Sequence, residues 1–211
     1  MIKLGKKEKK EEVEEKTEEG EQPGTVVDLL NALQDSAEQR SIMFVGEVSE
    51  EKSADLISAL LVLSQQKEEG AERAEDIKIY ISTYGGSADE MFGVYDVMNY
   101  CKQFCDIETI GFGKVMSAGT LILAGGTKGK RKLGKHCRVM IHSVNGGSIG
   151  ELHNLENEME QMKVLQDNYI QCLSSETEMT KRQIQSLINR KVNVYLSATE
   201  AIEKGLADEV L

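Results

Sequence analysis

A serine flanked by glycines is the first candidate for chemistry in this chain of 211 residues. Ser117 lies in the segment GFGKVMSAGT, residues 111–120, between an apolar stretch that predicts a strand and one that predicts a helix. A hydroxyl at such a turn is accessible, and the first backbone N–H groups of the helix lack intrahelical acceptors and can stabilise an oxyanion. Serine is also a common helix N-cap, so this segment alone leaves both roles open.

His142 is the candidate for a general base. It follows an apolar segment in RVMIHSV, residues 138–144, and comes 25 residues after Ser117. A serine hydroxyl is a poor nucleophile until an adjacent base takes its proton, and imidazole suits that task because its pKa lies near neutrality. Parallel strands would bring both residues to the same edge of a sheet. The alternative is a hydrogen-bonded core histidine.

The segment STYGG, residues 82–86, is the third candidate, placed between a predicted strand and a predicted helix. Gly86 can present a backbone N–H to a developing oxyanion because no side chain stands in the way. The alternative is that the paired glycines only make a tight turn.

Other kinds of site fit the sequence less well. An α/β-hydrolase nucleophile needs a glycine two positions earlier, where Val115 stands. Cys101 and Cys105 share a helix face, but no second pair of metal ligands follows them. Cys137 lies within a predicted strand and ranks behind Ser117 as a nucleophile. The segment GGTKGKR lacks the spacing and the ending of a phosphate-binding loop.

The elements that must position these residues alternate between strand and helix. Apolar periodicity predicts helices at residues 26–33, 49–66 and 91–98, directly after Ser117, and over a long segment that includes 155–173. Strands are predicted at residues 42–45, 77–81, 107–112 and 139–141, the first of them buried, with a turn at 83–86. Repeated strand–helix units indicate an α/β fold with a layered, mostly parallel sheet.

Two capping boxes predict the last helices. Thr180 with Gln183 begins one helix and Ser197 with Glu200 begins another, while Gly205 is a suitable C-terminal stop.

Composition and charge narrow the function classes. The formal net charge is −11, so a phosphate backbone would be repelled, and the basic run from Lys128 to Lys135 is interpreted as a solvated loop. The four cysteines do not make a dense disulfide framework, which indicates free thiols in a reducing cytoplasm. No apolar run reaches transmembrane length and no secretory signal is recognisable, so a cytoplasmic protein without membrane contact is expected.

The first residues differ from the rest of the chain. Residues 1–24 are dominated by lysine and glutamate up to Pro23 and Gly24, and such a segment has too few apolar groups to offset its ordering entropy. We therefore expect a charged, disordered tail at residues 1–24 and one domain at residues 25–211.

Four segments, in this order, resemble the Clp protease proteolytic subunit family. They are IYISTYGGSADEMFGVYDVM, GKVMSAGTLILAGGTKGKR, RVMIHSVNGGSIGE and YLSATEAIEKGLADEVL, and the resemblance runs from about Arg40 to Leu211. It implies the fold that Clp peptidases share with crotonases, with repeated ββα units and a protruding handle of a strand and a long helix at residues 143–175. A crotonase-type acyl-CoA enzyme would explain the glycines but not the serine and histidine.

The resemblance also implies roles for individual residues. Ser117 corresponds to the nucleophile, His142 to the base, and the N–H groups of Gly86 and Ala118 to the oxyanion hole. Substrate would lie as an added strand beside Gly85, Gly86, Ser143, Val144 and Asn145. By spacing back from YLSA, Asn189 is placed where the family usually has the aspartate of its triad, and Tyr84 stands where the family usually has proline.

The function implied is a serine endopeptidase that degrades unfolded polypeptides inside a closed chamber. The family assembles two stacked seven-membered rings and receives substrate from an AAA+ unfoldase, with no cofactor or metal in the peptidase. The alternative, suggested by an asparagine in the triad, is a structural or regulatory ring subunit with little activity.

Overall fold

The computed structural model of the chain describes residues 40–211. The predicted tail at residues 1–24, the boundary at residue 25 and the predicted helix at 26–33 lie outside the described residues. Residues 40–211 form one compact unit.

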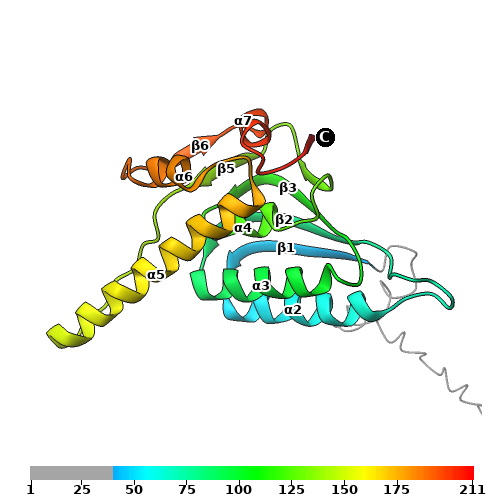
Figure 1. The fold of residues 1–211 in the computed structure, drawn as a ribbon, viewed down its shortest axis with the longest axis horizontal. Coiled ribbons are helices and arrows are strands. Elements are labelled where there is room, and N and C mark those ends of the chain that lie inside the picture. Colours follow the sequence, from blue (N-terminus) through cyan, green and yellow to red (C-terminus); the bar gives the residue numbers. More distant parts are fainter. Residues whose placement is uncertain (1–39) are drawn as a thin grey trace, which may run out of the picture. The chain divides into compact units, whose positions relative to one another are not determined.

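The described residues form a seven-stranded sheet (Figure 1). Its strands are β1 (Ser41–Val48), β2 (Ile77–Gly86), β3 (Ile107–Met116), β4 (Arg131–Leu133), β5 (Arg138–Ile141), β6 (Val194–Leu196) and β7 (Glu209–Val210). The order β1-β2-β3-β4-β7 is parallel throughout. The second half of β3 also pairs in parallel with β5, and β5 pairs with β6 antiparallel. The prediction of an α/β fold with a mostly parallel sheet is confirmed.

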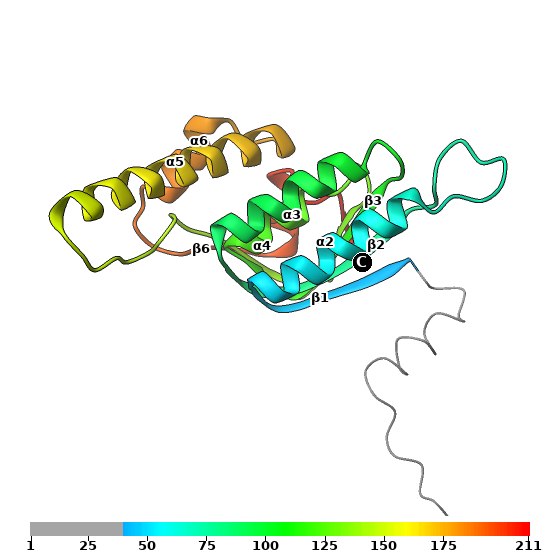
Figure 2. The ribbon, with the colours of Figure 1, turned by 90° about the horizontal axis from the view of Figure 1, so that it is seen from below.

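Helices cover the sheet and extend beyond it. They are α2 (Glu50–Gln65), α3 (Ala88–Cys101), α4 (Ala118–Ala124), α5 (Leu152–Glu176), α6 (Lys181–Ile188) and α7 (Ala198–Glu203). Figures 1 and 2 show α2 and α3 side by side against the sheet, and the short α4 packs against β2 and β3. The core lies between these helices and the alternating apolar side chains of the central strands, such as Ile77, Ile79 and Ile81 of β2.

Two details of the predicted strands are wrong. The first strand lies at the edge of the described sheet, with Phe44 and Val48 buried but Met43 and Val45 exposed, because β2 is its one partner among residues 40–211. The residues 83–86 form no separate turn: β2 continues to Gly86, which pairs with Val48. The longer β1 explains this, since it offers β2 a partner beyond the predicted strand end.

The long helix α5 has a packed half and a projecting half. Tyr169, Ile170 and Leu173 are buried near its C-terminal end, whereas its N-terminal half extends away from the sheet (Figures 1 and 2). The strand of the predicted handle is absent: residues 142–149 have no regular secondary structure. A strand requires a hydrogen-bonded neighbour, and no other strand of the described chain pairs with this segment.

The predicted helix ends near the C-terminus are confirmed. Both capping boxes are complete, with Thr180 and Gln183 at α6 and Ser197 and Glu200 at α7. Gly205 follows α7 with a φ of 74°, a left-handed conformation that glycine adopts without strain. These caps fix the segment that carries β6 next to β5.

The basic run from Lys128 to Lys135 is not a solvated loop throughout, because its middle forms β4 and makes ion pairs with the fold. Lys130 pairs with Asp106 at 2.9 Å, Lys132 with Glu108 at 2.6 Å, and the buried Arg131 with Asp208 at 2.6 Å. These contacts give the charges a structural role beside β4. Among residues 40–211, no helix combines the length and apolar character needed to cross a membrane.

Candidate active site

Ser117 and His142 meet at the end of two parallel strands. Met116 at the end of β3 pairs with Met140 of β5, so the residues that follow leave the sheet at the same edge. The Ser117 hydroxyl oxygen lies 2.7 Å from Nε2 of His142, which is hydrogen-bonding distance. The predicted meeting of the two residues at one sheet edge is therefore what the structure shows.

The backbone of Ser117 is strained. Its φ is 54° and its ψ is −123°, a conformation that costs a non-glycine residue about 1–3 kcal/mol and persists only where neighbours enforce it. Its N–H donates to the carbonyl of Met140 at 2.8 Å. Its side chain makes no capping hydrogen bond to α4, so the alternative of a simple helix cap does not explain this serine.

Two glycines of β2 let other groups approach closely. A Cβ added to Gly85 would lie 2.5 Å from Cβ of Ser117, and one added to Gly86 would lie 2.3 Å from the carbonyl oxygen of Val48. Both have positive φ, of 101° and 156°. Gly85 therefore leaves room for the serine, and Gly86 holds the strand end against β1.

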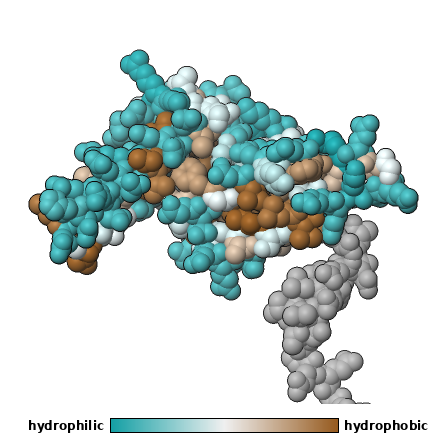
Figure 3. Space-filling model, turned by 60° about the horizontal axis from the view of Figure 1, so that its bottom comes forward, coloured by the Kyte–Doolittle hydropathy of each residue, from teal (hydrophilic) through white to brown (hydrophobic). Residues whose placement is uncertain are grey.

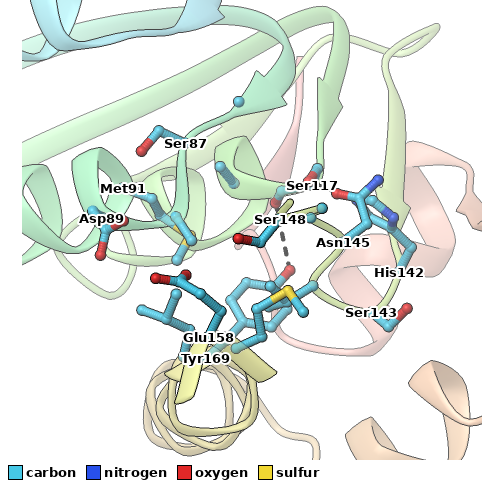
Figure 4. Close-up of a pocket in the computed structure, with 18 residues that line it drawn as sticks. Ser87, Asp89, Met91, Ser117, His142, Ser143, Asn145, Ser148, Glu158 and Tyr169 are labelled. Carbon is cyan, nitrogen blue, oxygen red and sulfur yellow. Dashed lines mark hydrogen bonds between the residues drawn. The ribbon is translucent and has the colours of Figure 1, made fainter. Parts of the chain in front are cut away.

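A cavity of about 290 Å³ opens beside the pair (Figure 4). Of the predicted site residues, those that line it are Gly86, Ser117, Ala118, His142, Ser143, Val144 and Asn145. Gly85 does not line it but packs behind Ser117. Residues far apart in the sequence thus share one hollow.

The imidazole of His142 is suited to accept a proton. Burial lowers its pKa below the usual 6.5, so the ring is neutral at pH 7. The competing nucleophile Cys137 is buried, and burial raises the pKa of its thiol to about 11. Cys137 therefore stays protonated at neutral pH, and Ser117 is the better nucleophile.

Asn189, the predicted third member of the triad, does not join the pair. It is the C-cap of α6 and lines a separate hollow with Arg182, Gln185, Ser186 and Arg190. The described structure records no hydrogen bond between Asn189 and His142. The prediction counted residues back from YLSA, but it ignored how β5 and β6 pair.

The strand register makes Asn193 a candidate for this role. Ile141 of β5 and Val194 of β6 form the last pair of an antiparallel ladder, and His142 and Asn193 are the residues next to this pair. Residues that face each other across such a ladder have Cβ atoms about 4.5–5.5 Å apart, whereas the recorded hydrogen bond of the Asn193 side chain runs from Nδ2 to the Tyr195 hydroxyl at 3.5 Å. The sequence alone did not indicate Asn193, because its candidacy depends on this ladder.

The nearby carboxylates are engaged elsewhere or exposed. Asp208 accepts hydrogen bonds from Nε and Nη2 of Arg131 at 2.9 and 2.6 Å. Partial burial alone would raise the pKa of Asp208, but these hydrogen bonds outweigh it and lower that pKa. Asp167 lies exposed on α5. Within residues 40–211, no group of three or more His, Cys, Asp or Glu side chains is arranged to hold a metal ion.

Comparison with known proteins decides the family. The sequence model of the Clp protease family matches residues 21–211. The chain belongs to the Clp protease family. It is 34% identical over 191 residues to an ATP-dependent Clp protease proteolytic subunit from Oltmannsiellopsis viridis, an alignment that covers 90% of this chain and 92% of that relative. The resemblance inferred from four motifs is confirmed, and with it membership in a family of serine peptidases.

Besides Asn189, another side chain departs from the usual Clp protease pattern. Tyr84 replaces the proline that usually precedes the paired glycines, and its side chain is exposed. The ammonium of Lys114 lies 4.5 Å from the centre of its ring, a cation–π contact between β2 and β3. Tyr84 therefore packs along the surface rather than into the cavity, where Figure 4 shows the serine and histidine.

Proposed function

We propose that the chain is an active serine endopeptidase of the Clp type. The observation that carries this proposal is the 2.7 Å contact between the hydroxyl of a strained Ser117 and a neutral His142. A subunit with only a structural role has no need for a strained serine held against a base. The adjoining cavity offers room for a peptide beside both residues.

The geometry supports acyl transfer in two steps. The Ser117 oxygen attacks the peptide carbonyl while Nε2 of His142 takes the hydroxyl proton, and the N–H groups of Gly86 and Ala118 stabilise the oxyanion. His142 then gives that proton to the leaving amine, which yields an ester on Ser117. Water attacks the ester with His142 again as base, and the acid product leaves.

In this proposal Asn193 takes the orienting role first assigned to Asn189. Its amide oxygen would accept the Nδ1 proton of His142 and so keep Nε2 free to act as base. It brings no negative charge, so the imidazolium that forms in the reaction receives less stabilisation than an aspartate would give.

The cavity predicts which peptides are cleaved best. Its wall carries the apolar side chains of Met91, Met162 and Leu165, and the carboxylates of Asp89 and Glu158 also line it. We expect peptides with an apolar residue before the cut and a basic residue nearby to be cleaved faster than acidic ones, by about tenfold, because carboxylates repel acidic side chains. Cleavage of a fluorogenic peptide library measures this. Equal rates for acidic and basic peptides would contradict it.

The activity should depend on pH through His142. Burial lowers the pKa of His142 below 6.5. We therefore expect kcat/KM to have reached its plateau at pH 7. It should fall only as the pH drops through that lowered pKa, where the ring becomes charged. Peptide hydrolysis between pH 4.5 and 8 gives the profile. An acid limb with its midpoint above pH 6.5 would contradict the expected environment of His142.

We further propose that the subunits assemble into two stacked heptameric rings that an AAA+ unfoldase feeds with unfolded polypeptides in the cytoplasm. Exposed apolar residues on the projecting part of the handle, Ile149, Leu152 and Met159, support contact with other subunits. Figure 3 shows apolar surface at the far end of this projection. The four free cysteines suit a reducing compartment.

A second candidate function is a ring subunit with little activity, favoured by Asn189, which stands where the family usually has the aspartate of its triad. Cleavage of fluorogenic peptides and of unfolded casein separates the two candidates, with Ser117→Ala as the control. The proposal requires turnover by the native assembly, with its mass verified by native mass spectrometry, and none by Ser117→Ala. An assembled ring without turnover would favour the second candidate.

A further inference from the structure

Two buried hydroxyl groups hold the carbonyl of Ser117. The Thr120 hydroxyl lies 2.6 Å from this carbonyl oxygen, and the Thr120 N–H donates to the same oxygen at 2.9 Å. The Tyr169 hydroxyl lies 2.5 Å from Oγ1 of Thr120 and 3.4 Å from the carbonyl oxygen. Figure 4 shows the Tyr169 hydroxyl reaching toward Ser117 from α5. Thr120 is 0% and Tyr169 4% exposed.

The direction of the hydrogen bonds follows from counting protons. Each hydroxyl has one proton, and the Thr120 proton is used on the Ser117 carbonyl. Tyr169 is therefore the donor in its contact with Thr120. Burial raises the pKa of Tyr169 to about 12, so its hydroxyl keeps the proton that it donates. The Tyr169 hydroxyl of α5 therefore donates to Thr120 of α4, and the Thr120 hydroxyl donates to the carbonyl of Ser117.

The held carbonyl shares a peptide unit with the N–H of Ala118. A trans peptide is planar, with C=O and N–H on opposite sides, so fixing the Ser117 oxygen also fixes the direction of the Ala118 N–H. Hydrogen bonds to a carbonyl also polarise the peptide and strengthen its own N–H as a donor. Without these hydroxyls, the strained φ of 54° at Ser117 has fewer contacts to maintain it.

We infer that Tyr169 and Thr120 are positioning residues, which hold the Ser117–Ala118 peptide so that its N–H faces the oxyanion. The inference rests on the proposed peptidase function. Neither residue touches the reacting atoms; both act through the peptide unit of the nucleophile. The oxyanion forms only in the transition state, so the effect belongs to kcat rather than to substrate affinity.

The test removes single hydroxyl groups and keeps the shape of the side chains. Loss of a whole oxyanion donor costs about 10²–10³ in kcat, so a donor that is only misaligned should cost about tenfold. We expect Tyr169→Phe and Thr120→Val each to lower kcat about tenfold with KM within about twofold, and to slow labelling by a fluorophosphonate equally. Thr120→Ser keeps a hydroxyl at this position and should therefore retain the native kcat. The double variant should be no slower than Thr120→Val, because the two act as one unit.

Tyr95→Phe is the matched control. Tyr95 is also buried, and its hydroxyl donates to Glu176 at 2.7 Å without contacting Ser117, so this variant should keep the native kcat with a similar loss of thermal stability. Native kcat in Tyr169→Phe, or an equal loss of kcat in Tyr95→Phe, would overturn this inference and leave the proposed function standing. An inactive native assembly would overturn the proposed function and the inference with it.

Discussion

Replacing Asn193 by aspartate is expected to increase peptide hydrolysis by about tenfold to a hundredfold. In the proposed arrangement Asn193 faces His142 one step beyond Ile141 and Val194, the last pair of β5 and β6, so a carboxylate there would stabilise the imidazolium that forms in the transition state. In a serine protease of known mechanism, the opposite change from aspartate to asparagine lowers kcat by about 10⁴. That factor is the upper limit of the gain expected here.

The same variant should shift the pH profile in a defined direction. A carboxylate near His142 favours the charged ring and raises its pKa, so the acid limb of kcat/KM should move to higher pH than in the native protein. Asn189→Asp is the matched control, since Asn189 lies at the end of α6 and lines a separate hollow. A gain in Asn189→Asp with none in Asn193→Asp would return the orienting role to Asn189 and refute the register argument.

Replacing His142 by alanine is expected to lower kcat by at least about 10³-fold. Without Nε2 at 2.7 Å, nothing in the described site removes the proton of the Ser117 hydroxyl, and in a related mechanism loss of the histidine costs about 10⁶. The double variant with Ser117→Ala should be no slower than His142→Ala alone, because the pair acts as a unit.

His136→Ala controls for the loss of a histidine as such. His136 is exposed between β4 and β5 and does not line the cavity, so this variant should retain native turnover. Native mass spectrometry and thermal unfolding of each variant separate loss of chemistry from loss of assembly. Turnover by His142→Ala protein of native assembly mass at more than about a tenth of the native rate would show that another group is the base.

Local sequence patterns predicted most of the helices and strands because these elements depend mainly on residues close together in the sequence. Alternating apolar residues in β2 and complete capping boxes at α6 and α7 each depend on residues a few positions apart. The extension of β2 to Gly86 depends on pairing with β1, and a strand near Ser143 requires a neighbour that the described chain does not supply. Such features arise from partners that are distant in the sequence or outside the chain.

The candidate site also contains residues that local patterns predicted and residues that they did not. Ser117 and His142 were predicted because each follows a strand, and parallel strands bring their ends together. Asn193, the proposed orienting residue, escaped prediction because it becomes a candidate only through the antiparallel pairing of β5 with β6. Tyr169 gave only an apolar helix pattern in the sequence; its hydrogen bond to Thr120 is visible only once α5 is packed against α4.

The most direct test of the central claim is covalent labelling of the native assembly with a serine-directed fluorophosphonate, followed by mass spectrometry of the modified peptide. One adduct per chain is expected, on Ser117 within GFGKVMSAGT, and it should be absent in Ser117→Ala and strongly reduced in His142→Ala. Correctly assembled native protein that remains unlabelled, or that carries its adduct on another residue, would contradict the claim that Ser117 is an activated nucleophile.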